Sequence, residues 1–180
     1  MSFELLRSEV VYRGRAFSVC RDRVRLPDGR ETTLDIVNHL GSVVILPLDH
    51  EGNLLFIRQY RHAARKELLE LPAGVLNPDE PPETCARREL REETGMNAGR
   101  MEPLGSFYLA PGYSTEYMHV YFATDLYPAP LEADADEFLA VEKIPLDQAL
   151  DLPSRGLLQD AKSLAALLLA QQQLAEMRHH

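Results

Sequence analysis

The stretch GVLNPDEPPETCARRELREETGM, residues 74–96, predicts a loop followed by a short charged helix. Pro81 and Pro82 mark the start of the helix, because a residue before proline avoids the α region and proline suits the first helical turn. Gly95 is a typical left-handed stop at the other end. The helix is therefore expected between Pro82 and Gly95.

Three acidic residues, Glu89, Glu92 and Glu93, lie in the last two turns of this helix. The carboxyl end of a helix carries a partial negative charge, so each acid there costs about 0.3–1 kcal/mol. Residues three and four apart also share a face, where like charges repel. An Arg88–Glu92 salt bridge is one explanation, but exposed pairs contribute little. A divalent cation explains the cluster better, because Mg²⁺ binds carboxylates, waters and substrate phosphates.

Apolar and β-branched runs predict strands in two parts of the chain. Residues 42–49, 53–60 and 116–126 are expected to form strands of a mixed sheet covered by helices. Residues 1–40 carry β-type runs that are too few to bury a core alone. We therefore expect a small antiparallel β domain over 1–40, which packs on the main α/β domain over 41–180 or pairs with another subunit.

Two further helices are expected after residue 140. The segment 145–152 has the pattern of a short helix, and 159–177 has the apolar period of an amphipathic one. The apolar face of the longer helix is expected to contain Leu164, Leu167, Leu168 and Leu174.

Composition limits the classes of function. Of the 180 residues, 45% are hydrophobic and 26% charged, as in an ordinary globular protein, and no apolar run approaches a membrane span. The net charge of −9 argues against a nucleic-acid partner. Cys20 and Cys85 have no metal-type spacing, so we expect two buried thiols in a cytoplasmic protein. A phosphate substrate would need a cation or local arginines in so acidic a chain.

The pattern that begins at Gly74 and ends at Met96 resembles the Nudix box at every position. That box reads G-x5-E-x7-R-E-U-x-E-E-x-G-U, where U is an aliphatic residue. The resemblance implies an α/β/α sandwich with a mixed sheet and a loop-helix-loop site. It also implies Mg²⁺-dependent hydrolysis of a nucleoside diphosphate linked to another moiety, with two or more ions per site and Mn²⁺ as the alternative metal.

The resemblance also implies roles for individual residues of the box. The metal ligands would be the carbonyl of Ala73 and the carboxylates of Glu89, Glu92 and Glu93. The residues that shape and brace the box would be Gly74, Glu80, Arg88 and Gly95.

Beyond the box, the chain resembles the ADP-ribose pyrophosphatase branch of the family. The resemblance rests on Pro111, fifteen residues past Met96, on RQYR at 58–61, and on residues 136–150. Arginine matches phosphate oxygens, so Arg58 and Arg61 are candidates for the diphosphate, with Arg61 favoured. The alternative is that Arg61 only pairs with acids, and that Pro111 forms a plain turn rather than a loop over the terminal ribose.

Two further assignments follow from the same branch. Glu116 would bind a ribose hydroxyl or a water, although it could equally be solvated. Residues 1–40 would form a homodimer that contributes to the adenosine pocket of the partner. Tyr12 and Phe17 could stack on adenine, but a place in the core is the preferred interpretation for both.

The general base is expected on the acidic loop 132–137. Glu137 matches the family position best, and Glu132, Asp134 and Asp136 remain alternatives, as does a role for Glu92 or Glu93 in activating the water. Acidic loops are often only solvated, which leaves the choice open.

Three other functions compete with ADP-ribose hydrolysis. The first is hydrolysis of other nucleoside diphosphate sugars, such as GDP-mannose or ADP-glucose, because the box reads only the diphosphate. The second is a sensor that binds ADP-ribose without hydrolysis, although all box acids are present here. The third is an enzyme that removes oxidised nucleoside triphosphates, which the amino-terminal β segment and Pro111 make less suitable.

Overall fold

The chain divides into two compact units in the computed structural model, which describes residues 2–132 and 138–177. One unit comprises Met1–Gly41 and Phe107–Tyr117, and the other comprises Ser42–Ser106 and Met118–His180. No helix within the described ranges is long and apolar enough to cross a membrane.

The first unit contains a small antiparallel sheet, as expected. Its strands are β1 (Glu4–Arg13), β2 (Ser18–Arg25) and β3 (Glu31–Asn38), in the order β1-β2-β3. Among the described residues of these strands, Val24 is the only buried apolar side chain. Such a sheet has almost no core of its own. The preferred interpretation of Tyr12 and Phe17 as core residues is therefore wrong for the single chain, since their exposed fractions are 56% and 42%.

The segment Phe107–Tyr117 belongs to this first unit because it hydrogen-bonds to β3. The Val37 N–H donates to the carbonyl of Tyr113, and the Thr115 N–H donates to the carbonyl of Val37. No local pattern in the sequence indicated this long-range pairing.

The second unit contains two sheets. The larger one has the order β7-β4-β9-β8, and β4 pairs antiparallel with β7 but parallel with β9, so it is the expected mixed sheet. Its strands are β4 (Ser42–Pro47), β7 (Ala73–Val75), β8 (Met96–Tyr108) and β9 (Tyr117–Pro128). The smaller sheet has the order β10-β5-β6. Its strands are β5 (Asn53–Arg61), β6 (Lys66–Glu70) and β10 (Leu139–Pro145).

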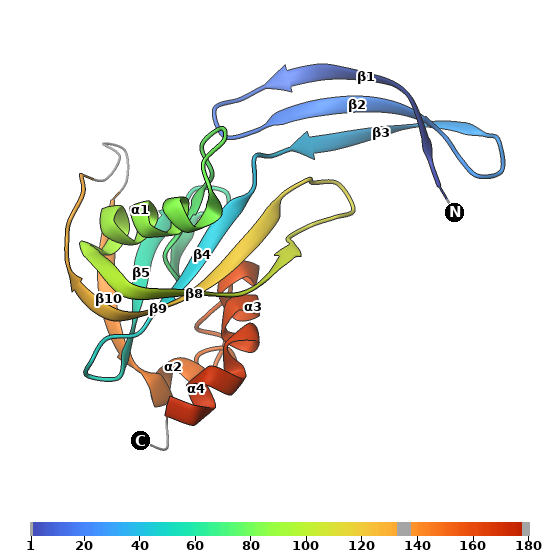
Figure 1. Cartoon of the computed structure of the whole chain (residues 1–180). Coiled ribbons are helices and arrows are strands. Elements are labelled where there is room, and N and C mark those ends of the chain that lie inside the picture. Colours follow the sequence, from blue (N-terminus) through green and yellow to red (C-terminus); the bar gives the residue numbers. More distant parts are fainter. Residues whose placement is uncertain (1, 133–137, 178–180) are drawn as a thin grey trace. The chain divides into compact units, whose positions relative to one another are not determined.

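Helices cover both sides of the larger sheet, which confirms the α/β/α sandwich. Figure 1 shows α1 (Pro82–Thr94) on one side, and α2 (Leu146–Asp151), α3 (Ala161–Leu169) and α4 (Gln171–Met177) on the other. The central strand β4 is buried along its whole length, as a strand covered on both faces must be.

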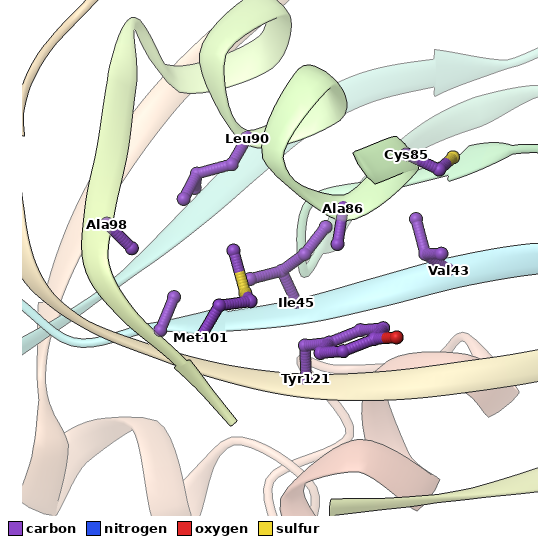
Figure 2. Close-up of a cluster of buried hydrophobic side chains, with 9 residues drawn as sticks. Val43, Ile45, Cys85, Ala86, Leu90, Ala98, Met101 and Tyr121 are labelled. Atoms are coloured by element: carbon purple, nitrogen blue, oxygen red, sulfur yellow. The ribbon is translucent and has the colours of Figure 1, made fainter. Parts of the chain in front are cut away.

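The core beneath α1 holds this helix in place. Val43 and Ile45 of β4 join Ala86 and Leu90 of α1 in one buried cluster, together with residues of β8 and β9 (Figure 2). Alternate residues of a strand point to opposite faces, so Val44 and its even-numbered neighbour face the other helical layer. The position of α1 is thus fixed by packing of Ala86 and Leu90 on β4.

The expected single helix over 159–177 is wrong, because α3 ends at Leu169 and α4 begins at Gln171. The predicted apolar face is also partly wrong. Leu167 and Leu174 are buried, but Leu164 and Leu168 are exposed, the latter by 70%.

The two cysteines are free thiols, as expected, but only one is buried. Cys85, on the buried face of α1, lies in the core, where burial raises the pKa of its thiol. Cys20, on β2, is half-buried, so the expectation of two buried thiols holds for Cys85 alone.

Candidate active site

The helix α1 begins and ends where its sequence predicts. Pro81 has extended backbone angles and Pro82 is the first helical residue. Gly95 has a φ of 72°, in the left-handed region, and its N–H donates to the carbonyl of Arg91. This stop leaves the acidic residues in the last two turns of the helix.

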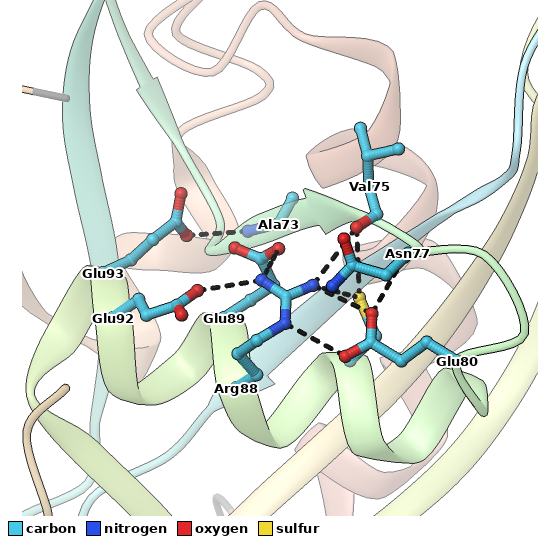
Figure 3. Close-up of polar contacts among 9 residues, drawn as sticks. Ala73, Val75, Asn77, Glu80, Arg88, Glu89, Glu92 and Glu93 are labelled. Carbon is cyan, nitrogen blue, oxygen red and sulfur yellow. Dashed lines mark hydrogen bonds and ion pairs between the residues drawn. The ribbon is translucent and has the colours of Figure 1, made fainter. Parts of the chain in front are cut away.

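The acidic residues face the loop that precedes the helix. Glu89 and Glu93 are buried, with exposed fractions of 8% and 6%. The Ala73 N–H donates to Oε2 of Glu93 at 2.9 Å (Figure 3). The carboxylate of Glu89 lies against Gly74, where a Cβ atom would stand only 1.8 Å from Cδ of Glu89. Glycine is thus needed at position 74 for Glu89 to lie where it does.

Arg88 lies among three carboxylates, those of Glu80, Glu89 and Glu92, as Figure 3 shows. Its Nε and Nη2 each donate to one oxygen of Glu80 at 3.0 Å. Its Nη1 donates to Glu89 at 2.6 Å and to Glu92 at 2.9 Å. Repulsion within the acidic cluster is therefore offset in part by one guanidinium. The Arg88–Glu92 salt bridge that the helical spacing suggested is one of several contacts of Arg88.

Glu80 connects the loop to the helix. The Asn77 N–H donates to Oε2 of Glu80 at 2.9 Å, while Arg88 holds both oxygens of the same carboxylate. The Arg88 guanidinium lowers the pKa of the Glu80 carboxyl to about 2, with a further contribution from the Asn77 N–H. The carboxylate is thus ionised at neutral pH and keeps the loop closed on α1.

The donors around the end of α1 suit a hard divalent cation. Glu89, Glu92 and Glu93 supply carboxylate oxygens, and Arg88 contacts Glu89 and Glu92. Within residues 2–132 and 138–177, no group of three or more His, Cys, Asp or Glu side chains is arranged to hold a metal by itself. Mg²⁺ usually takes one or two carboxylates, and its further ligands are waters and substrate phosphates.

The two candidate phosphate ligands lie in different surroundings. Arg61 donates through Nε and Nη2 to Glu70, at 2.9 and 2.7 Å. This hydrogen-bonded pair raises the pKa of Arg61, and the carboxylate of Glu93 is near enough to add to the effect. Arg58 instead pairs with Glu142 of β10. The two arginines are three apart on β5 and so point to opposite faces. Arg61 is the arginine that interacts with Glu93.

Pro111 and Glu116 lie in the first unit. Pro111 is exposed, in a turn closed by bonds from the N–H groups of Tyr113 and Ser114 to the carbonyl of Ala110. The Glu116 N–H donates to Oγ of Ser114, and its carbonyl accepts from Leu109. Their substrate roles remain predictions.

The acidic loop begins beside the end of α1. The Leu131 N–H donates to the carbonyl of Arg91 at 3.3 Å, and Nε of Arg91 donates to the carbonyl of Ala129 at 2.8 Å. Glu132 follows and is exposed. Asp134, Asp136 and Glu137 lie outside the described residues, so the assignment of the base remains a prediction.

Two residues near the site were missed by the sequence analysis. Glu70 is buried beside Arg61, and Lys162 of α3 contacts the same carboxylate. An acid within the apolar run that precedes Ala73 was a usable signal for Glu70. Lys162 lies 92 residues away along the chain, and nothing local connects it to the site.

Comparisons with known proteins agree with this geometry. A family model described as the NUDIX domain matches residues 38–167. A second model, described as the nucleoside diphosphate sugar hydrolase N-terminal domain, matches residues 3–33.

Individual relatives cover most of the chain. The ADP-ribose pyrophosphatase of Bacillus subtilis (strain 168) is 34% identical over 164 residues, which span 90% of this chain and 89% of that protein. The GDP-mannose pyrophosphatase of Escherichia coli O1:K1 / APEC is 33% identical over 138 residues, 71% of each chain. A crystal structure of an ADP compounds hydrolase superposes with a TM-score of 0.87 at 28% identity, over 98% of this chain and 96% of that one.

Proposed function

Because this chain belongs to the Nudix hydrolase family, we propose that it hydrolyses the diphosphate of ADP-ribose, giving AMP and ribose 5-phosphate. The observation that carries the proposal is the pair of buried carboxylates, Glu89 and Glu93, at the end of α1 beside Ala73. Similarity to the ADP-ribose pyrophosphatase along 90% of the chain supports the choice of substrate.

The carboxylates of α1 would hold the metal of this reaction. We assign Mg²⁺, or Mn²⁺ as the alternative, to Glu89, Glu92, Glu93 and the carbonyl of Ala73. When bound, such an ion lowers the pKa of a water and stabilises charge on phosphate oxygens. Glu80 and Arg88 keep the loop and the acids in place without contacting the substrate, and Gly74 gives Glu89 its space.

The remaining residues would bind the substrate and move the proton. Arg61, beside Glu93, would hold a phosphate of the diphosphate, and Arg58, Pro111 and Glu116 complete the proposed binding residues. The proton of the attacking water would pass to Glu137, with Glu92 and Glu93 as the alternative bases within the box. A base must lie within hydrogen-bond reach of that water.

Hydrolysis of another nucleoside diphosphate sugar is the second candidate, because the chain is also similar to a GDP-mannose pyrophosphatase. The deciding experiment measures nucleoside monophosphate release from ADP-ribose, ADP-glucose and GDP-mannose with Mg²⁺. We expect the highest kcat/KM for ADP-ribose. A preference for GDP-mannose would refute the substrate, and binding of ADP-ribose without AMP release would refute the enzyme.

The β-rich domain over 1–40 is proposed to form a homodimer. This domain exposes large apolar side chains that a second copy could cover. They include Phe3, Leu5, Val10, Val11, Tyr12, Phe17, Leu34 and Leu40. We expect a mass of twice the 20.3 kDa of one chain by light scattering, and a shift toward monomer for Val10→Lys. Gln172→Lys, at an exposed polar position of α4 outside this domain, should leave the dimer intact. A monomeric wild-type protein would contradict the proposal.

A further inference from the structure

A buried carboxylate with two cationic partners lies next to the proposed diphosphate site. The side chain of Glu70, the last residue of β6, is 2% exposed. Arg61 holds both of its oxygens, and Nζ of Lys162 contacts Oε2 of the same group. Lys162 is itself 13% exposed and also pairs with Asp160 at 2.8 Å. The four groups form a charge-balanced cluster.

Stability alone is a weak reason for such a cluster. Removing a carboxylate and two cations from water costs about as much free energy as their mutual attraction returns, and apolar side chains of similar volume often serve equally well. Burial by itself raises the pKa of the Glu70 carboxyl, but the hydrogen bonds from Arg61 and Lys162 bring it below its ordinary value. Glu70 is therefore a fixed negative charge. Because stability does not account for its burial beside Arg61, that burial needs an explanation in function.

The geometry of Arg61 supplies that explanation. A guanidinium has five N–H donors arranged in a planar fork. Glu70 accepts from Nε and Nη2, along one edge of the plane, so the donors of Nη1 lie on another edge. The Arg61 side chain is 41% exposed, although Glu70 is not, and its charge interacts with Glu93. One edge is thus held by the buried Glu70, while Nη1 donates no hydrogen bond within the described residues.

We infer that Glu70 is a positioning residue, which holds one edge of Arg61 so that the opposite edge binds a phosphate of the substrate beside Glu93. This inference rests on the proposed hydrolysis of a nucleoside diphosphate. Lys162 balances the charge of Glu70, so that Arg61 presents its donors from a neutral cluster rather than from a negative one. Without Lys162, the cluster would carry excess negative charge next to an anionic substrate.

Charge and positioning predict opposite effects for Glu70→Gln. Removing a negative charge near a diphosphate should strengthen binding and lower KM if only the local field mattered. Glutamine cannot accept both charge-assisted bonds from Arg61, so loss of positioning should raise KM. We expect an increase of about tenfold in KM, the size of one charged hydrogen bond, with kcat changed less than about threefold. Calorimetry measures ADP-ribose affinity without interference from turnover if the Glu93→Gln background is used. Adding Glu70→Gln to Glu93→Gln should weaken that affinity by the same factor.

Matched controls separate this effect from general changes in charge. Glu67→Gln makes the same substitution at an exposed position of β6, and Lys66→Met removes an exposed lysine that contacts Gln159 instead of Glu70. Both should keep KM within about twofold of the wild type. An unchanged or lower KM for a folded Glu70→Gln protein overturns the inference.

Lys162 gives a second test if Glu70→Gln does not fold. Lys162→Met leaves the Glu70–Arg61 pair in place and should raise KM about threefold, whereas Lys162→Arg should restore it. An unchanged KM for Lys162→Met overturns the inference. Failure of this inference is distinct from failure of the proposed function, because the latter would appear as absence of AMP release by the wild-type protein. If another nucleoside diphosphate sugar is preferred, the same KM comparison applies to that substrate.

Discussion

Replacing Glu93 with glutamine is expected to lower kcat for AMP release by about a hundredfold or more, with the fold retained. Glu93 is 6% exposed in the last turn of α1, and it accepts a hydrogen bond from the Ala73 N–H. Glutamine keeps an acceptor oxygen for that bond, so the loop should stay in place. The charge that would bind a divalent cation is lost.

The measurement is AMP release from ADP-ribose over a range of Mg²⁺ concentrations, with thermal unfolding as the test of fold. Glu83→Gln is the matched control, because Glu83 lies on the same helix but is exposed and forms an ion pair with Arg87, away from the acidic cluster. It should keep wild-type turnover. Near-wild-type kcat for Glu93→Gln would refute the metal assignment.

Local sequence signals predicted helix α1 well. Pro82 and Gly95 set its ends through backbone preferences that need no distant partner, and both lie where expected. The apolar pair Ala86 and Leu90 is fully buried, because the same spacing that predicts a helix also defines the face that packs on β4.

The carboxyl-terminal helices show why a hydrophobic pattern can mislead. The buried stripe of α3 contains Ser163, Ala166 and Leu167, and it continues at Ala170 with the helical spacing of three, four and seven. Apart from Leu167 its residues are small, so the larger Leu164 and Leu168 dominated the apolar pattern although they are exposed. Ser163 is buried because its Oγ accepts a hydrogen bond from the Leu71 N–H, a partner 92 residues away.

Long-range ion pairs were the other part of the site that the sequence could not predict. Arg61 was a candidate from the sequence, but its partner Glu70 and the contact of Lys162 depend on how β5, β6 and α3 meet. The same holds for Thr115 and Val37, whose backbone bonds assign the Pro111 segment to the first unit. Spacing within a motif determines local structure, whereas these pairings follow from the complete fold.

Gly74→Ala is expected to abolish most activity and to destabilise the protein by about 1–3 kcal/mol. The added Cβ would lie 1.8 Å from Cδ of Glu89, so one of the two must move. The Glu89 side chain is the more flexible partner, but Arg88 holds its carboxylate at 2.6 Å and it is 8% exposed. We expect Glu89 to leave its place, and the proposed metal site to lose a ligand.

A double-mutant cycle with Glu89→Ala isolates this contact. In the Glu89→Ala background the carboxylate is gone, so adding Gly74→Ala should lower the unfolding free energy by less than about 0.5 kcal/mol. It should also lower the enzymatic activity little further. Gly112→Ala is the control for stability, because a Cβ at Gly112 meets no atom within 4 Å. If Gly74→Ala costs the same unfolding free energy with and without Glu89, the clash is not the cause. Gly74 would then act through the backbone of β7, and the close packing of Gly74 on Glu89 would not explain why this loop begins with glycine.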